Sequence, residues 1–280
     1  MLSLLLEHFR ILQKHFLYSL LPTHGIDFNK NILKKQEGGT VDYKPYTYEN
    51  NTFTIKIDDD DPNEINISIV STDGTDCVTV FVHRKLRLAI INNMSYYENC
   101  SKEGLKYPGG GTTLFKLILA FLKKNKEKYK IKRIILADHS FLSCSKKNDN
   151  RLNLAQFKMI TDGRTWYMKY GFLPYDAFKG KPSANGLLFL KHNIKVLETL
   201  KTSSMKIMES ASKLKNIDKN ELQRLINKYP LLKDFVKRLS TDLEKYCILI
   251  EAILDNAYKM YGAGGQTLHD FYNTQFYLDI

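Results

Sequence analysis

The sequence is poor in the residues that build metal sites and disulfide frameworks. Only four of its 280 residues are cysteines, Cys77, Cys100, Cys144 and Cys247, and no two of them are spaced as C-x-x-C. This pattern argues against a zinc ribbon or a disulfide framework, and it predicts an intracellular, cytoplasmic location that keeps thiols reduced. The seven histidines show no H-E-x-x-H spacing, so we expect no metal site.

Long uncharged apolar runs are also missing. The most apolar stretch, residues 2–21, is interrupted by charged residues such as Glu7 and Lys14, and no small-residue cleavage site follows it. It therefore predicts an amphipathic helix ending at Pro22, not a signal peptide or a transmembrane segment. We expect this helix to dock against the core; a partner helix and a membrane-surface anchor are the alternatives.

Arginine is scarce although the chain is basic, with a formal net charge of +12. Most basic residues are lysines, in runs such as 123–126 and 146–148. Arginine is the side chain suited to bidentate contacts with phosphate and guanine, so nucleic-acid binding is the weakest functional interpretation. Lysines on solvated helix faces explain most of the excess, and a salt-sensitive affinity for polyanions follows from it.

Several segments predict strands from their apolar pattern. Four of them, 53–57, 65–70, 77–83 and 86–92, are separated by turn residues and predict an antiparallel meander. A Val/Ile/Leu-rich run, 131–138, predicts a buried strand beside the last of these. Two further expectations are strands supplied by 186–190 and a short helix within 152–160. The fold class is α+β, a mixed, mostly antiparallel sheet flanked by helices.

The C-terminal third predicts helices. Residues 194–215 have helical character, Asp218 begins a capping box for a helix over 221–228, and Pro230 begins a longer helix toward Tyr261. We expect the last residues to form a flexible aromatic tail that packs on the body or on another subunit. The predicted organisation is an N-terminal helix and connector, a sheet domain, a helical appendage and this tail: 1–50, 51–192, 193–261 and 262–280.

A glycine run precedes the apolar helix expected over 114–122. The run reads Lys106-Tyr107-Pro108-Gly109-Gly110-Gly111-Thr112-Thr113. The first backbone amides of a helix lack intrahelical partners and lie at the positive end of its dipole, so a phosphate group binds well there. Glycine also lets a ligand approach the backbone closely, although a Pro-Gly-Gly-Gly run is often only a flexible connector.

A second segment lies downstream, Trp166-Tyr167-Met168-Lys169-Tyr170-Gly171-Phe172. The two segments, in this order, resemble the GNAT superfamily of N-acetyltransferases. In that family a Gln/Arg-x-x-Gly-x-Gly/Ala loop begins the helix that holds the pyrophosphate of acetyl-CoA, and a later helix ends in a Leu-Tyr-x-Lys-x-Gly-Phe-like run. Lys106-x-x-Gly109-x-Gly111 matches the loop with lysine in the first position. The resemblance covers about residues 51–192 and is interrupted by an insertion over 140–161.

The resemblance implies direct transfer of an acetyl group from acetyl-CoA, as cosubstrate, to an amine in a ternary complex. The acceptor is a small molecule or a protein lysine or N-terminus. Tyr167 takes the family's position for the acid that protonates the leaving thiolate, and a backbone N–H within 89–92 stabilises the oxyanion. The residues expected to hold the pyrophosphate are Lys106, as a nearby charge, and the backbone of Gly109, Gly110, Gly111, Thr112 and Thr113.

The general base is not defined by any motif. Glu98, in the loop before the glycines, and His83, at the end of a strand, are the two candidates. Asp138-His139-Ser140 has the residue types of a catalytic triad, but neighbours on a strand point to opposite faces, so we do not expect a triad here. The missing base and the long insertion leave an alternative open. In it, catalysis has lapsed and the chain is a structural or interaction protein, with partners bound through the N-terminal helix or the C-terminal tail.

Overall fold

A computed structural model describes residues 41–49, 51–94, 100, 110–144, 150–212, 214, 216–259 and 268–280. The helix predicted over 2–21 lies outside these residues. The chain forms two compact units. The first runs up to Ala137 and includes two returning segments, Asp176–Lys181 and Tyr277–Ile280, and the second comprises Asp138–Tyr175 and Pro182–Phe276. The predicted boundaries at 192 and 261 therefore fall within the second unit.

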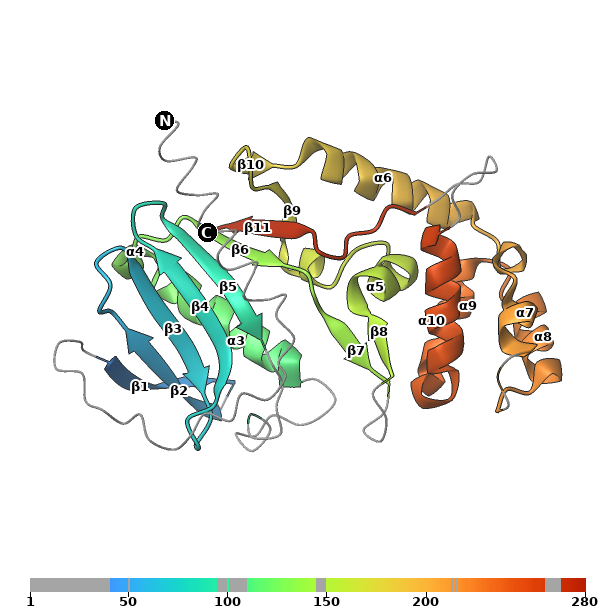
Figure 1. Ribbon diagram of the computed structural model, residues 1–280, viewed down its shortest axis with the longest axis horizontal. Helices are drawn as coiled ribbons and strands as arrows, with labels where there is room; N and C mark the ends of the chain where they lie inside the picture. Colours follow the sequence, from blue (N-terminus) through green and yellow to red (C-terminus); the bar gives the residue numbers. More distant parts are fainter. Residues whose placement is uncertain are drawn as a thin grey trace. The chain divides into compact units, whose positions relative to one another are not determined.

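The first unit is built on an antiparallel meander, which Figure 1 shows as neighbouring strands. Its strands are β1 (Val41–Tyr48), β2 (Asn51–Asp58), β3 (Glu64–Val70), β4 (Asp76–His83) and β5 (Leu88–Met94). Each pairs antiparallel with the next. Alternate residues of β2, Phe53, Ile55 and Ile57, are buried, as expected for a strand with one face on the core. The four predicted strands are thus confirmed, and β1 is an additional edge strand.

A helical crossover follows the meander. After β5 come α3 (Gly110–Lys124), the short α4 (Lys126–Tyr129) and β6 (Arg133–Ala137), and β6 pairs parallel with β5. The helix α3 has a stripe of buried apolar residues that includes Leu114, Leu117 and Ile118. This stripe has helical spacing, so it covers the sheet while the lysines at the helix end face solvent. The parallel pair joined by a helix makes the sheet mixed, as predicted.

The chain returns to the sheet near its C-terminus. The remaining strands are β9 (Leu173–Asp176), β10 (Lys181–Pro182) and β11 (Gln275–Asp279), and the strand order is β1-β2-β3-β4-β5-β6-β11-β9-β10. Within the first unit, the Ile280 amide donates to the Lys132 carbonyl (3.1 Å), and Arg133 pairs with Asp279 (2.6 Å). The aromatic tail was predicted to pack on the body or on another subunit. In the structure its last residues pack on the chain's own first unit.

The second unit is mostly helical. It contains a hairpin of β7 (Phe141–Ser143) and β8 (Arg151–Asn153), then α5 (Leu154–Asp162), α6 (Ala184–Thr199), α7 (Ile207–Ser212), α8 (Lys219–Lys228), α9 (Leu232–Leu239) and α10 (Leu243–Lys259). Short 3-10 turns lie at Tyr167–Tyr170, Thr202–Met205 and Ser240–Asp242. The predicted short helix of the insertion is confirmed as α5. Asp218 caps α8 by accepting hydrogen bonds from the amides of Asn220 (2.8 Å) and Glu221 (3.2 Å), as its capping-box pattern predicted.

Two predictions for this region are wrong. Residues 186–190 are not strands but part of α6, where the Ser183 hydroxyl accepts a hydrogen bond from the Gly186 amide (3.1 Å) and starts a helix. A five-residue apolar run has no readable period, and here Leu188 is 61% exposed. The single long helix after Pro230 is instead two helices, α9 and α10, joined by the turn at Ser240–Asp242.

Candidate functional site

The predicted phosphate-binding run reaches the start of α3. The helix begins at Gly110, which is buried, and Gly111, Thr112 and Thr113 are half-buried in its first turn. This turn holds no acidic side chain, so no carboxylate within it offsets the positive end of the helix dipole. A Cβ placed on Gly111 would meet no atom of the described residues within 4 Å. Among the described residues, the space beside Gly111 is therefore not filled.

The strand before this helix has an irregular hydrogen-bond ladder. Thr79 pairs with Asn93 and Val80 pairs with Ile91, so Asn92 is an extra residue in β5. The extra residue of a bulge is left out of the ladder, which frees its backbone groups for another partner. Because β5 and β6 are parallel, α3 runs back along the sheet between them, and its first turn belongs to the edge where β5 ends. The bulge therefore lies toward the same edge of the sheet as the start of α3.

His83, one of the two candidate bases, lies at the other edge. It pairs with Leu88, the first residue of β5, whereas the bulge and the start of α3 follow the other end of that strand. Its side chain is buried, with 5% of its surface exposed. The structure therefore does not bring His83 together with Gly111. Three predicted residues, Glu98, Lys106 and Gly109, lie outside the described residues.

Tyr167, the predicted acid, belongs to the second unit. Its ring packs among aromatic side chains, with centroid distances of 4.9 Å to Trp166, 6.3 Å to Phe172 and 6.5 Å to Phe276. Only 6% of its surface is exposed. Burial, with a smaller contribution from the charge of Asp138, raises the pKa of Tyr167 far above its usual value, against the opposing effect of a hydrogen bond with Ser140. The hydroxyl thus stays protonated at every physiological pH.

A buried carboxyl group lies close to this tyrosine. Asp138 is completely buried, and its Oδ1 accepts hydrogen bonds from the backbone amide of Ser140 (3.2 Å) and from the Ser140 hydroxyl. Its Oδ2 has no hydrogen-bond partner within the described part of the chain. Burial raises the pKa of Asp138 to about 6, although the hydrogen bonds from Ser140 act in the opposite direction. Ser140 thus links a buried carboxyl group to the Tyr167 hydroxyl.

This Asp138–Ser140–Tyr167 chain was not predicted as a site. These residues lie between β6 and β7, outside any strand, so strand alternation does not apply to them, and the His139 ring packs against Tyr272 at a centroid distance of 5.7 Å. Asp138 and Ser140 meet through a local turn instead, in which the Ser140 amide and hydroxyl both donate to Asp138 Oδ1. An Asp-x-Ser at the end of a buried strand was therefore the available signal, but the link to Tyr167 depends on tertiary packing.

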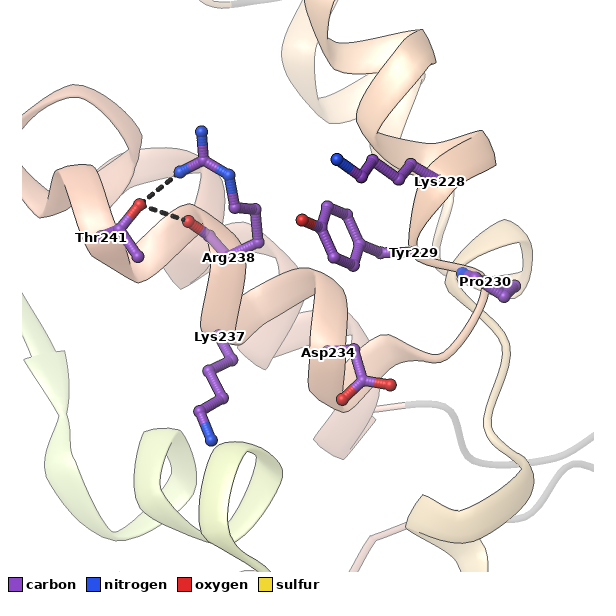
Figure 2. Close-up of a pocket in the computed structure, with 7 residues that line it drawn as sticks. All are labelled: Lys228, Tyr229, Pro230, Asp234, Lys237, Arg238 and Thr241. Carbon is purple, nitrogen blue, oxygen red and sulfur yellow. Dashed lines mark hydrogen bonds between the residues drawn. The ribbon is translucent and has the colours of Figure 1, made fainter.

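A pocket of about 400 Å³ lies in the second unit, between the end of α8 and the last turn of α9 (Figure 2). Its lining includes Lys228, Tyr229, Asp234, Arg238 and Thr241. It was not predicted from the sequence, because most of these residues are exposed and lie at the ends of helices or in the turns beside them, where charged side chains are ordinary. None of the residues predicted for acetyl-CoA belongs to this pocket.

The cysteine prediction is wrong, because all four cysteines are paired. Cys77 bonds to Cys100 and Cys144 bonds to Cys247, each with a Cα–Cα distance of 5.9 Å. Bonding depends on this distance in the fold, and spacing in the sequence does not report it for residues 23 and 103 positions apart. The cysteines therefore no longer support a reducing compartment.

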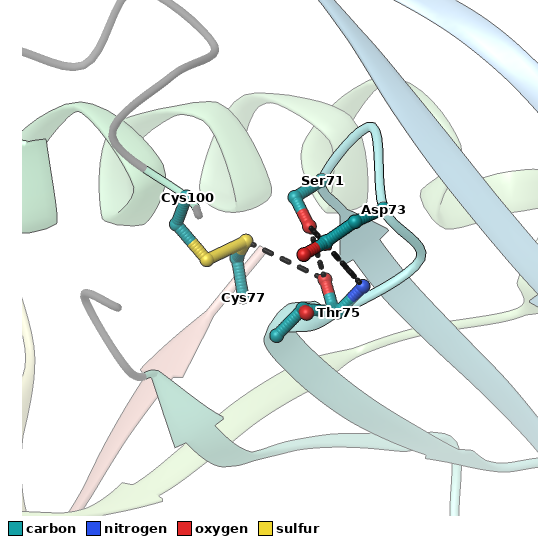
Figure 3. The surroundings of a disulfide bond; sticks show 5 residues. All are labelled: Ser71, Asp73, Thr75, Cys77 and Cys100. Carbon is teal, nitrogen blue, oxygen red and sulfur yellow. Dashed lines mark hydrogen bonds between the residues drawn. A yellow bond between two sulfur atoms is a disulfide. The ribbon is translucent and has the colours of Figure 1, made fainter. Parts of the chain in front are cut away.

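The first disulfide lies beside a well-ordered turn (Figure 3). The Ser71 hydroxyl donates to the Asp73 carboxylate, and the Thr75 amide donates to Asp73 Oδ1 (3.1 Å) and to the Ser71 hydroxyl (3.1 Å). The hydrogen bond from Ser71 is the main reason that the pKa of Asp73 is lowered. The turn thus fixes the start of β4 immediately before Cys77.

Within the described ranges, no three His, Cys, Asp or Glu side chains are grouped so that they would hold a metal ion. No helix in that part of the chain has the length and apolar character needed to cross a membrane.

Comparison with protein-family models, curated proteins and solved structures finds no match to this chain. Two features therefore bear on the function: the glycine-rich first turn of α3 in the first unit and the Asp138–Ser140–Tyr167 chain in the second.

Proposed function

We propose that this chain is an acetyl-CoA-dependent N-acetyltransferase of the GNAT type. The observation that carries the proposal is the first turn of α3, which is glycine-rich, free of acidic side chains and not covered at Gly111 by any of the described residues. This helix connects two parallel strands, β5 and β6, and helix N-termini in such crossovers are established binding sites for phosphate groups. Acetyl-CoA supplies a pyrophosphate of that kind.

In this proposal the backbone amides of Gly110, Gly111, Thr112 and Thr113 hold the pyrophosphate, with Lys106 and Gly109 completing the loop. The acceptor amine attacks the thioester carbon, and the backbone freed by the Asn92 bulge supports the developing oxyanion. The C–S bond then breaks, and Tyr167 gives its proton to the departing sulfur. Burial keeps Tyr167 protonated but also makes it a weaker acid, so its proton must move as the C–S bond breaks and the sulfur gains charge.

The base that removes the proton from the amine is Glu98 or a water chain. His83 is not part of the proposal, since it lies at the opposite edge of the sheet. The acceptor remains an amine of a small molecule or of a protein. An intracellular location is a separate proposal, which no longer follows from the cysteines.

A second candidate function is a non-catalytic scaffold of the same fold. The observation that favours it is the packing of Tyr167, whose ring is enclosed by Trp166, Phe172 and Phe276 and is 6% exposed. A tyrosine held in this way also serves as a packing residue, which requires no substrate.

Thermal unfolding with acetyl-CoA is the first test. A ligand present at about a hundred times its dissociation constant stabilises the folded chain by roughly 2.7 kcal/mol, so the transferase proposal predicts a clear rise in Tm. No shift at millimolar acetyl-CoA would remove the transferase and leave the scaffold.

Thiol release with a panel of amines then separates an active enzyme from a scaffold that only binds CoA. We expect Tyr167→Phe to lower kcat by a factor of about 10² to 10⁴ while acetyl-CoA still raises Tm, because the ring and its packing are retained. Tyr170→Phe is the matched control, since it removes the hydroxyl of a neighbouring tyrosine on the same 3-10 turn. Equal turnover by wild type and Tyr167→Phe would assign Tyr167 to packing alone.

A further inference from the structure

The pocket between α8 and α9 gathers positive charge that the fold itself does not use. Lys228 ends α8, and Arg238 lies in the last turn of α9. Within the described part of the chain, neither side chain forms an ion pair with a carboxylate. Both are exposed residues lining the same pocket of about 400 Å³, so their charges are available to a ligand.

Three hydrogen-bond donors are directed into one space. Figure 2 shows the Lys228 ammonium, the Tyr229 hydroxyl and the Arg238 guanidinium converging, whereas Lys237 extends in a different direction. The Lys228 Nζ lies 5.6 Å from the centroid of the Tyr229 ring, a cation–π distance that holds the ammonium beside the ring. The donors therefore come from two helices and from the connection that follows the first of them.

The guanidinium is held in place before any ligand binds. Arg238 Nη1 donates to the Thr241 hydroxyl, which in turn donates to the Arg238 carbonyl (2.8 Å). This leaves the other N–H groups of the guanidinium to face the pocket as a planar fork, the geometry that matches two oxygens of a phosphate. Because the Arg238 side chain is already ordered in the folded protein, binding a ligand costs less side-chain entropy.

The acidic side chain that lines the pocket limits the size of the ligand. Asp234 lines the pocket from α9 and in Figure 2 lies apart from the three donors. Its carboxylate repels additional phosphate groups, which disfavours a diphosphate or a nucleic-acid backbone. It accepts hydrogen bonds from a hydroxyl or amine on the rest of a small ligand.

We propose that this pocket binds a small phosphate monoester. The Arg238 fork holds two phosphate oxygens, the Lys228 ammonium and the Tyr229 hydroxyl bind the third, and the organic part of the ligand lies toward Pro230 and Asp234. The site is separate from the proposed acetyl-CoA site, because it shares no residue with it.

The test is a titration of the full chain with inorganic phosphate and with glycerol 2-phosphate, followed by amide chemical shifts at constant ionic strength. We expect saturating shifts at residues 228–241. Arg238→Gln and Lys228→Ala should each weaken binding about tenfold, as expected for one charge-assisted contact. Arg238→Lys should weaken it similarly, because the charge remains while the fork is lost.

Lys219→Ala is the matched control, since it removes one exposed lysine from α8 outside the pocket. It should change the dissociation constant less than twofold. Gly111→Ala should leave these shifts unchanged, which keeps this site distinct from the proposed acetyl-CoA site. Three outcomes would overturn the proposal: chemical-shift changes that do not saturate, changes that spread over lysines throughout the chain, or a loss of affinity in Lys219→Ala as large as that in Lys228→Ala.

Discussion

Asn193 shows how one residue ties a late segment of the chain to a helix of the second unit. It is completely buried on α6, its Nδ2 donates to the His269 carbonyl (2.7 Å), and its Oδ1 accepts from the His269 amide (2.8 Å). The Asn193 side-chain amide therefore pairs with both the N–H and the C=O of His269, which lies 76 positions away, as a neighbouring strand would.

We expect Asn193→Ala to lower the free energy of unfolding by about 2 kcal/mol, since it leaves the half-buried N–H and C=O of His269 without this partner. Urea denaturation measures this loss. Gln223→Ala serves as control, because Gln223 makes only an exposed hydrogen bond to Asn227 (3.1 Å), and it should change stability by less than about 0.5 kcal/mol. Equal losses in both variants would contradict this account of Asn193.

Asp138 makes the stability of the chain depend on pH. Its folded-state pKa of about 6 exceeds that of an unfolded aspartate, so the folded state binds the proton more tightly. The groups that face it are Ser140, Tyr167, Asp270 and Tyr272, and none of them is cationic. Its contribution to stability is therefore present below about pH 4 and is lost as pH rises toward 6.

Asp138→Asn should remove this dependence. The amide oxygen still accepts the hydrogen bonds from Ser140, and no charge has to be buried above pH 6. We expect the variant to be more stable than wild type at pH 7.5, by up to about 3 kcal/mol, and to lose most of this advantage at pH 4. Urea midpoints at pH 4, 5, 6 and 7.5 check it, and a difference that does not vary with pH would disprove it.

Gly111 offers a residue-scale test in which stability and binding change in opposite directions. Alanine at this position meets no atom of the described residues within 4 Å and has the better helix propensity, so Gly111→Ala should raise the free energy of unfolding by up to about 1 kcal/mol. The added methyl group occupies the space that a pyrophosphate would use, so acetyl-CoA affinity should fall at least about tenfold. Calorimetric titration measures the affinity.

Lys123→Ala is the control for general electrostatics, since Lys123 lies in the last turn of α3. It should leave acetyl-CoA affinity within about twofold of wild type. If Gly111→Ala is stabilised and binds acetyl-CoA as well as wild type, the ligand does not use the first turn of α3.

At the scale of elements, the two disulfides tie different parts of the chain. Cys77–Cys100 closes a loop around β4 and β5, whereas Cys144–Cys247 joins the end of β7 to α10 across 103 positions. The longer loop removes more entropy from the unfolded chain, so the second bond should stabilise more, by about 5 kcal/mol against about 3.

Paired substitutions test this order, because they leave no unpaired thiol. Cys144→Ser with Cys247→Ser should lower the free energy of unfolding more than Cys77→Ser with Cys100→Ser. Guanidinium denaturation without reductant measures both, and in excess reductant the four-cysteine chain should be no more stable than either variant. Thiol alkylation of the unfolded wild type should find no free cysteine; finding four would contradict the pairing.

The elements differ in how far the sequence predicted them. Strands β2 to β5 were predicted because each is a short apolar run bounded by turn residues, and α8 because Asp218 supplies a local cap. Residues 186–190 were misassigned because the apolar run is too short to define a period. The disulfides and β11 depend on contacts between distant segments, which no local pattern encodes.

The candidate site was predicted in the same uneven way. Gly110 to Thr113 do form the first turn of α3, since glycines before an apolar periodic run mark a helix start locally. The link from Ser140 to Tyr167 was missed, because a hydrogen bond across the insertion follows only from the packed second unit.

At the scale of the whole molecule, the net charge of +12 bears on which partner is specific. Attraction from scattered lysines acts on every polyanion and weakens with salt, whereas a site made of backbone amides loses less affinity on screening. If the lysines contact three phosphates of a single-stranded nucleic acid, it should bind about twentyfold more weakly at 200 mM than at 50 mM salt.

Fluorescence anisotropy with a labelled oligonucleotide, beside calorimetry with acetyl-CoA over the same salt range, measures both dependences. We expect acetyl-CoA affinity to fall by a smaller factor than oligonucleotide affinity, and Gly111→Ala to reduce only the former. Oligonucleotide binding that is tight at 200 mM and insensitive to salt would mean that contacts other than charge recognise nucleic acid. That outcome would move nucleic-acid binding ahead of the transferase, because scattered lysines alone do not produce it.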